Sequence, residues 1–173
     1  MEREKYTRVT EILDKYSGLH SVPEKVLNGA KERGTAVHKY ISGHLNALPS
    51  DIAPEFQGYA DSFHKIEDQF EWLNEPGRLY CDERKISGEP DHLAMYKGDL
   101  TIIDFKTPLK ESKSWALQAA GYTYLAEKND YMIKRRVFIR LDKFGNPAEI
   151  YEYPYLKDMF LMAVELHKYF YGE

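Results

Sequence analysis

The sequence contains a single cysteine, Cys81, among 173 residues. One cysteine cannot form an intramolecular disulfide, and it cannot supply the several thiolates of a self-contained zinc or iron–sulfur site. The composition therefore excludes a disulfide framework and an iron–sulfur cluster held by this chain alone.

The chain also lacks long apolar runs, low-complexity segments and internal repeats. No stretch has the roughly 20 apolar residues of a membrane span, and none has the pattern of a secretory signal. A hydrophobic content of 43% with 14 tyrosines is ample for one core. We therefore expect one domain, residues 1–173, that is soluble, cytoplasmic and without a membrane partner.

Positive charge is not in excess, since 24 basic and 28 acidic side chains give a net charge of -4. This balance argues against binding of nucleic acid by bulk electrostatics, because backbone affinity comes from neutralising phosphates with Lys and Arg. The basic residues are nevertheless grouped. They are Lys106, Lys110 and Lys113, then Lys134, Arg135, Arg136, Arg140 and Lys143, and they either flank a phosphate groove or form ordinary solvated faces.

Two short stretches carry the strongest chemical signal. The first is Gly88-Glu89-Pro90-Asp91, and the second, thirteen residues later, is Asp104-Phe105-Lys106. Between them, His92–Tyr96 and the apolar run Leu100–Ile103 predict two strands joined by a tight turn at Lys97-Gly98-Asp99. Asp91 and Asp104 are then expected on neighbouring strands.

Side chains alternate along a strand, so Asp104 and Lys106 should project to one face and Ile103 and Phe105 to the other. Mg²⁺ prefers oxygen ligands, which Asp91, Asp104 and the Phe105 carbonyl could provide. Lys106 could then orient or polarise an attacking water. The alternative is an exposed Asp104–Lys106 ion pair, worth about 0–1 kcal/mol.

A helix is expected at Glu24–Leu45, where Val37 and Ile41 begin an apolar stripe. His38 lies beside that stripe, as a structural histidine or as a ligand. Gly34 lies one turn earlier, and because glycine inside a helix costs about 1 kcal/mol relative to alanine, it suggests a close approach to the backbone.

A second helix is expected at Ser114–Glu127. Gln118 and Tyr122 are four residues apart and should share one face of it, directly after the Asp104 strand. Tyr122 is either part of a functional site or a core residue with its hydroxyl at the edge. Glu83 is a further acidic candidate, and it could equally be one of several solvent-facing charges.

The coarse pattern predicts an α/β fold with a mixed sheet flanked by helices. Helices are expected at 10–15, 24–45, 55–70, 114–127 and 156–170, and strands at 79–86, 91–96, 100–106, 136–141 and 149–153. The segment from the third strand through the 114–127 helix to the next strand has the length of a βαβ unit.

Four parts of the sequence resemble, in their order along the chain, the motifs of the PD-(D/E)XK nuclease superfamily. They are the Glu32–His38 stretch, Asp91, the Asp104/Lys106 pair and Gln118-Ala119-Ala120-Gly121-Tyr122. Within it, the pattern is similar to the RecB-like and phage-type exonucleases. The resemblance implies a restriction-endonuclease-like core. It also implies a metal-dependent DNA exonuclease that hydrolyses phosphodiester bonds in phage or recombination DNA processing, in the host cytoplasm if a phage encodes it.

The resemblance also implies roles for individual residues. The expected catalytic residues are Asp91, Asp104 and Lys106; the expected ligands of one or two Mg²⁺ or Mn²⁺ ions are His38, Asp91, Asp104 and the Phe105 carbonyl; the expected substrate-binding residues are Gln118 and Tyr122. DNA is the expected partner, and a homo-oligomer or a recombination partner protein stays open. The alternatives are a structure-specific endonuclease and a non-catalytic nucleic-acid-binding module on the same scaffold.

Overall fold

The computed structural model describes residues 6–18 and 21–172 of the chain. Its centre is a mixed five-stranded sheet with the order β2-β5-β6-β7-β8. The strands of this sheet are β2 (Glu71–Trp72), β5 (His92–Tyr96), β6 (Asp99–Lys106), β7 (Arg135–Arg140) and β8 (Glu149–Glu152). A smaller sheet, β1-β4-β3, contains β1 (Thr7–Arg8), β3 (Leu79–Cys81) and β4 (Ile86–Gly88).

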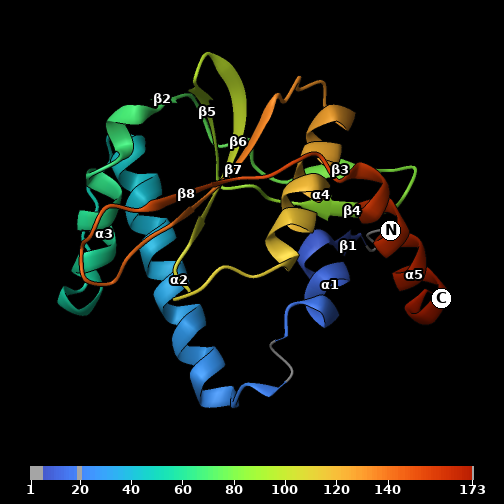
Figure 1. Cartoon of the computed structure of the whole chain (residues 1–173), viewed down its shortest axis with the longest axis horizontal. Helices are drawn as coiled ribbons and strands as arrows, with labels where there is room; N and C mark the ends of the chain where they lie inside the picture. Colours follow the sequence, from blue (N-terminus) through green and yellow to red (C-terminus); the bar gives the residue numbers. More distant parts are fainter. Residues whose placement is uncertain (1–5, 19–20, 173) are drawn as a thin grey trace.

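Helices cover both faces of the large sheet (Figure 1). The longer helices are α1 (Val9–Leu13), α2 (Glu24–Leu45), α3 (Gln57–His64), α4 (Ser114–Lys128) and α5 (Lys157–Tyr171), and short 3-10 turns lie at η1 (Asp14–Tyr16), η3 (Pro54–Phe56) and η4 (Glu67–Gln69). Helices α2 and α3 lie on one side, and α1, α4 and α5 lie with the small sheet on the other. The expected α/β architecture with a mixed sheet flanked by helices is confirmed.

Each face of the large sheet buries its own hydrophobic cluster. Ile102 of β6 packs into the cluster under α4 and α5, whereas Ile103 and Phe105 pack into the cluster under α2 and α3. This is the alternation that a strand buried on both faces requires. Asp104 and Lys106 therefore share the α4 side of β6 with Ile102.

Strand β6 pairs in parallel with β7, from Thr101 opposite Arg135 to Lys106 opposite Arg140. Parallel neighbours need a crossover, and α4 provides it. The expected βαβ unit is thus present, and it places the start of α4 just after the end of β6.

Two segments differ from the prediction. The expected strand 79–86 is a hairpin of β3 and β4, because four consecutive charged residues, Asp82 to Lys85, form its turn, and Lys85 has a φ of 52°. The expected helix 55–70 is limited to α3 between two 3-10 turns, because the chain bends at Ile66 to bury that side chain. Strands β1 and β2 have two residues each, too few to show an alternating pattern.

Helix α2 has the predicted bounds, Glu24–Leu45. No other part of the protein approaches Gly34, since a Cβ built there meets no atom within 4 Å; an approach of DNA to this glycine stays a prediction. In the described part of the chain, no helix combines the length and the apolar character needed to cross a membrane.

Gly121 is the glycine of α4 whose missing side chain matters for packing. A Cβ built there would lie 2.6 Å from Phe160 Cε2 and 2.9 Å from Val9 Cγ1. Both neighbours are fully buried, so they have little room to move. Gly121 is thus the contact point of α4 with α5 and α1.

Replacing Gly121 by alanine should lower the free energy of unfolding by about 1–3 kcal/mol, because the added methyl overpacks this contact. Gly34→Ala is the matched control, with the same chemical change in open space within a helix. It should raise stability by up to about 1 kcal/mol. Urea unfolding followed by circular dichroism measures both, and equal effects of the two substitutions would contradict the packing argument.

Candidate active site

The pairing of β5 with β6 brings the two sequence-distant acids together. The strands are antiparallel and His92 lies opposite Ile103. The next pair of residues that face each other is therefore Asp91 and Asp104. The tight turn between the strands has Lys97 at a φ of 51° and Gly98 at 81°, as a two-residue type I′ connection requires. Asp91 Oδ2 accepts a hydrogen bond of 2.7 Å from the Phe105 backbone N–H.

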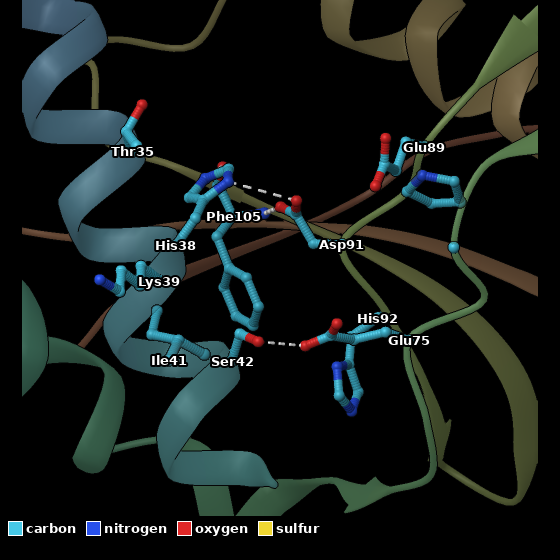
Figure 2. Close-up of a pocket in the computed structure, with 12 residues that line it drawn as sticks. Thr35, His38, Lys39, Ile41, Ser42, Glu75, Glu89, Asp91, His92 and Phe105 are labelled. Carbon is cyan, nitrogen blue, oxygen red and sulfur yellow. Dashed lines mark hydrogen bonds and ion pairs between the residues drawn. The ribbon is translucent and has the colours of Figure 1, made fainter. Parts of the chain in front are cut away.

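His38 joins this group from α2 (Figure 2). Its Nδ1 lies 3.2 Å from Asp91 Oδ1, and its Nε2 donates a 2.9 Å hydrogen bond to the Phe105 carbonyl. Burial by itself would lower the pKa of His38, but Asp91, then Asp104 and the Phe105 carbonyl outweigh it and raise that pKa to about 9. In the absence of a metal ion, the imidazole is therefore held as a cation between the acids.

Asp104 is the most buried acid of the group, with 3% of its surface exposed. Burial and the nearby Asp91 raise the pKa of Asp104 to about 6, against the lowering effect of Lys106 and His38. The Lys106 ammonium lies 2.7 Å from Asp104 Oδ2, yet that oxygen accepts no hydrogen bond of good geometry. Asp104 thus offers a buried oxygen that a cation can satisfy.

A hydrogen-bonded chain leads from Lys106 into α4. Lys106 Nζ donates to Gln118 Oε1 at 2.9 Å, and Gln118 Nε2 donates to the Tyr122 hydroxyl at 2.8 Å. Tyr122 is buried, and burial and Asp104 raise the pKa of its hydroxyl well above the usual value. The predicted i, i+4 pair on α4 therefore faces Asp104 and Lys106 at the end of β6.

A cleft of about 600 Å³ opens beside Asp91 and His38. It is also lined by residues that sequence reasoning did not select as site residues, namely Thr35, Lys39, Ser42, Glu75, Glu89 and His92. Glu75 accepts a hydrogen bond from the Ser42 hydroxyl across the cleft (Figure 2). Two of these residues lie within motif stretches of the sequence, Thr35 in Glu32–His38 and Glu89 in Gly88–Asp91. The other four lie in no such stretch.

A second cavity, of about 450 Å³, lies on the α4 side of the sheet and is lined by Lys106, Lys110 and Gln118, among others. In the other basic stretch, two arginines are paired with acidic side chains. Arg135 pairs with Asp99 and Glu152, and Arg140 pairs with Glu149. Of the two predicted basic groups, the one around Lys106 therefore faces a cavity beside the acids.

Glu83 lies outside this group. It is exposed in the turn between β3 and β4, where its carboxylate pairs with Lys128 at 3.1 Å. The solvent-facing interpretation of Glu83 is the one that fits the structure.

The donors fit a hard divalent cation. The two carboxylates and the Phe105 carbonyl could supply oxygen ligands, and Asp104 Oδ2, which pairs with the Lys106 ammonium, accepts no hydrogen bond. His38, Asp91 and Asp104 do not offer three ligand atoms all within 4.8 Å of one another; in residues 6–18 and 21–172 the His44, His64 and Glu67 group alone does so. At His38 an ion would take the place of the proton that Asp91 now stabilises.

The protonated state of His38 gives a measurable prediction. In metal-free protein, NMR titration of the His38 ring should give a pKa of about 9. Asp91→Asn should lower this pKa, because it removes the carboxylate that raises it most. A His38 pKa that Asp91→Asn leaves unchanged would contradict this pairing.

The same shift predicts the pH dependence of stability. A pKa raised on folding stabilises the protein fully below the unfolded value of about 6.5, and this contribution is lost as the pH rises toward 9. The stability difference between wild type and His38→Gln in metal-free urea unfolding should therefore shrink from pH 6 to pH 9. A difference that grows with pH would contradict the sign of the shift.

Neither protein-family models nor curated protein sequences match this chain. Solved structures do. A candidate exonuclease from Eubacterium rectale superimposes with a TM-score of 0.60 at 15% identity, covering 94% of this chain and 78% of that one. An alkaline exonuclease from Laribacter hongkongensis gives a TM-score of 0.50 at 14% identity, covering 95% and 86%. The chain therefore has the restriction-endonuclease-like fold that its PD-(D/E)XK motifs predicted.

Proposed function

We propose that this protein is a metal-dependent deoxyribonuclease that acts as an exonuclease. The observation that carries the proposal is that four side chains meet at one end of the β5–β6 pair. They are His38 of α2, Asp91 just before β5, and Asp104 and Lys106 of β6. The structural neighbours described as exonucleases share the fold that presents these groups. The motif resemblance adds a role in phage or recombination DNA processing.

The chain would hold one or two Mg²⁺ or Mn²⁺ ions through His38, Asp91, Asp104 and the Phe105 carbonyl. When bound, such ions lower the pKa of a water molecule and stabilise charge on the scissile phosphate. His38 must give up its proton to act as a ligand, so loading should be easier at alkaline pH. Mn²⁺ should substitute well for Mg²⁺, because imidazole suits a transition metal better.

Lys106 has two properties that suit it to position the nucleophile. Its ammonium is held between Asp104 and Gln118, and only 16% of its side chain is exposed. A fixed positive charge in a partly buried site can orient a water and offset negative charge that develops on the phosphate. The Gln118 amide binds Lys106, and the Tyr122 hydroxyl binds Gln118, so the two residues hold Lys106 in place. In this proposal they also contact the substrate backbone.

Asp104→Asn and Lys106→Gln should each lower the cleavage rate at least about 100-fold, because each removes a charge that the reaction uses and leaves a polar side chain in its place. Initial rates on end-labelled linear DNA with Mg²⁺ or Mn²⁺ measure this. Lys143→Gln, an identical change in an exposed loop, is the control. Wild-type rates in both site variants would refute the assignments.

Substrate topology separates the proposal from its two alternatives. An exonuclease should degrade linear DNA and leave covalently closed circles intact, because it needs an end. A structure-specific endonuclease would cut a circle that contains the required structure. A binding module would retard labelled DNA in a gel without shortening it, with or without Mn²⁺, and that result would overturn the enzymatic proposal.

A further inference from the structure

A second group of metal-ligating side chains lies on α2, α3 and η4. His44 Nε2 is 2.8 Å from Glu67 Oε2, and His64 Nδ1 is 2.8 Å from Glu67 Oε1. The three residues offer ligand atoms that all lie within 4.8 Å of one another. We call them the histidine–glutamate cluster. It shares no residue with the candidate active site.

The cluster joins three segments of the chain. His44 is in the last turn of α2, His64 ends α3, and Glu67 begins η4. Helices α2 and α3 lie side by side (Figure 1). The fold therefore brings together a histidine and an H-x-x-E pair that are 20 residues apart in the sequence.

The surroundings hold the ligands in place. The Tyr40 hydroxyl lies 2.8 Å from His64 Nε2, which leaves His64 Nδ1 to face the carboxylate. The Trp72 indole N–H donates a 2.9 Å hydrogen bond to the Glu67 carbonyl. The His44 ring meets the His64 ring edge to face, with centroids 4.7 Å apart. Such partners are typical of the outer shell that orients ligands in metal sites.

In the cluster, His44 is exposed, and His64 and Glu67 are half-buried. The three side chains have exposed fractions of 38% for His44, 32% for His64 and 28% for Glu67. The carboxylate is thus partly shielded from solvent, which strengthens its attraction for a cation. Enough surface stays open for an ion to enter and for water to complete its coordination.

We propose that the histidine–glutamate cluster is a binding site for a transition-metal ion, with Zn²⁺ the best match. Two imidazoles and one carboxylate form a donor set that zinc favours, with water in the remaining position. Mg²⁺ prefers oxygen ligands and does not compete well for such a set. The ion would take the place of the hydrogen-bonding protons between each imidazole and Glu67.

The site would act as a clamp between helices. A bound ion links the end of α2 to the α3–η4 segment and so closes the intervening loop. His38 lies six residues before His44 on the same helix, about 9 Å along its axis. The clamp would thereby fix the helix that carries His38 without contributing to the chemistry there.

The test is zinc binding by metal-free full-length protein in the presence of excess Mg²⁺. Calorimetry with Zn²⁺ should show a binding site that is retained in Asp104→Asn and lost in the double variant His64→Gln/Glu67→Gln. His167→Gln on α5, on the opposite side of the molecule (Figure 1), is the control and should bind zinc like wild type. Co²⁺ should give an intense visible absorption band only where the cluster is intact.

Thermal unfolding provides a second readout that does not depend on nuclease activity. At a zinc concentration roughly a hundredfold above Kd, the melting temperature of wild type should rise by about 5–10 °C. With Mg²⁺ in excess, as in the calorimetry, the double variant should show a clearly smaller rise than wild type. Its circular dichroism spectrum and metal-free melting curve show whether it folds. If it does not fold, the single variant His44→Gln takes its place.

Two results would overturn the proposal. Equal zinc affinity in wild type and in the folded cluster variant would show that the cluster holds no zinc. Loss of zinc binding in Asp104→Asn together with retention in the cluster variant would assign the ion to the candidate active site instead. Since neither measurement uses DNA, the outcome is independent of whether the protein is a nuclease.

Discussion

The candidate site depends on the antiparallel register of β5 and β6. The tight turn at Lys97 and Gly98 fixes which residues face each other, and it sets Asp91 against Asp104 although they are thirteen residues apart. A slip of one residue would turn Asp104 and Lys106 away from α4 and bury charge against the opposite cluster. Both the hydrophobic core and the candidate site therefore require this register.

The cost of burying Asp104 explains much of what surrounds it. A buried carboxylate is expensive unless cations and hydrogen bonds compensate it. Lys106 and the protonated His38 supply positive charge, and Gln118 and Tyr122 hold Lys106 where it is needed. The compensation is incomplete, since one oxygen of Asp104 lacks a hydrogen bond. In the proposed function, a bound metal ion would complete this compensation.

The sequence predicted most of the fold because the relevant signals are local. Helix α2 follows from an apolar stripe, the β5–β6 hairpin from a glycine turn between alternating runs, and α4 from a segment without proline. The β3–β4 hairpin was missed because a charged turn inside a β-prone run looks like an edge strand. The short strands β1 and β2 exist only because longer partners pair with them.

For the candidate site, too, the residues that could be predicted are those whose proximity follows from local signals in the sequence. Asp104, Lys106, Gln118 and Tyr122 were predictable, since their neighbourhood follows from one strand and the helix after it. Glu75 and Ser42, which meet across the cleft, come from segments whose proximity depends on how α2 packs on the sheet. The proximity of His44, His64 and Glu67 could not be predicted either, because no residue spacing in the sequence indicates that the ends of α2 and α3 lie close together.

The fold places few demands on particular side chains. Apart from the packing contact at Gly121, the Gly98 turn and the handful of polar groups around Asp104, most positions need only to be apolar inside and polar outside. Such a scaffold can exchange nearly all of its residues over evolutionary time without changing its backbone. Tolerance of this kind explains how two chains with 15% identity can have the same architecture.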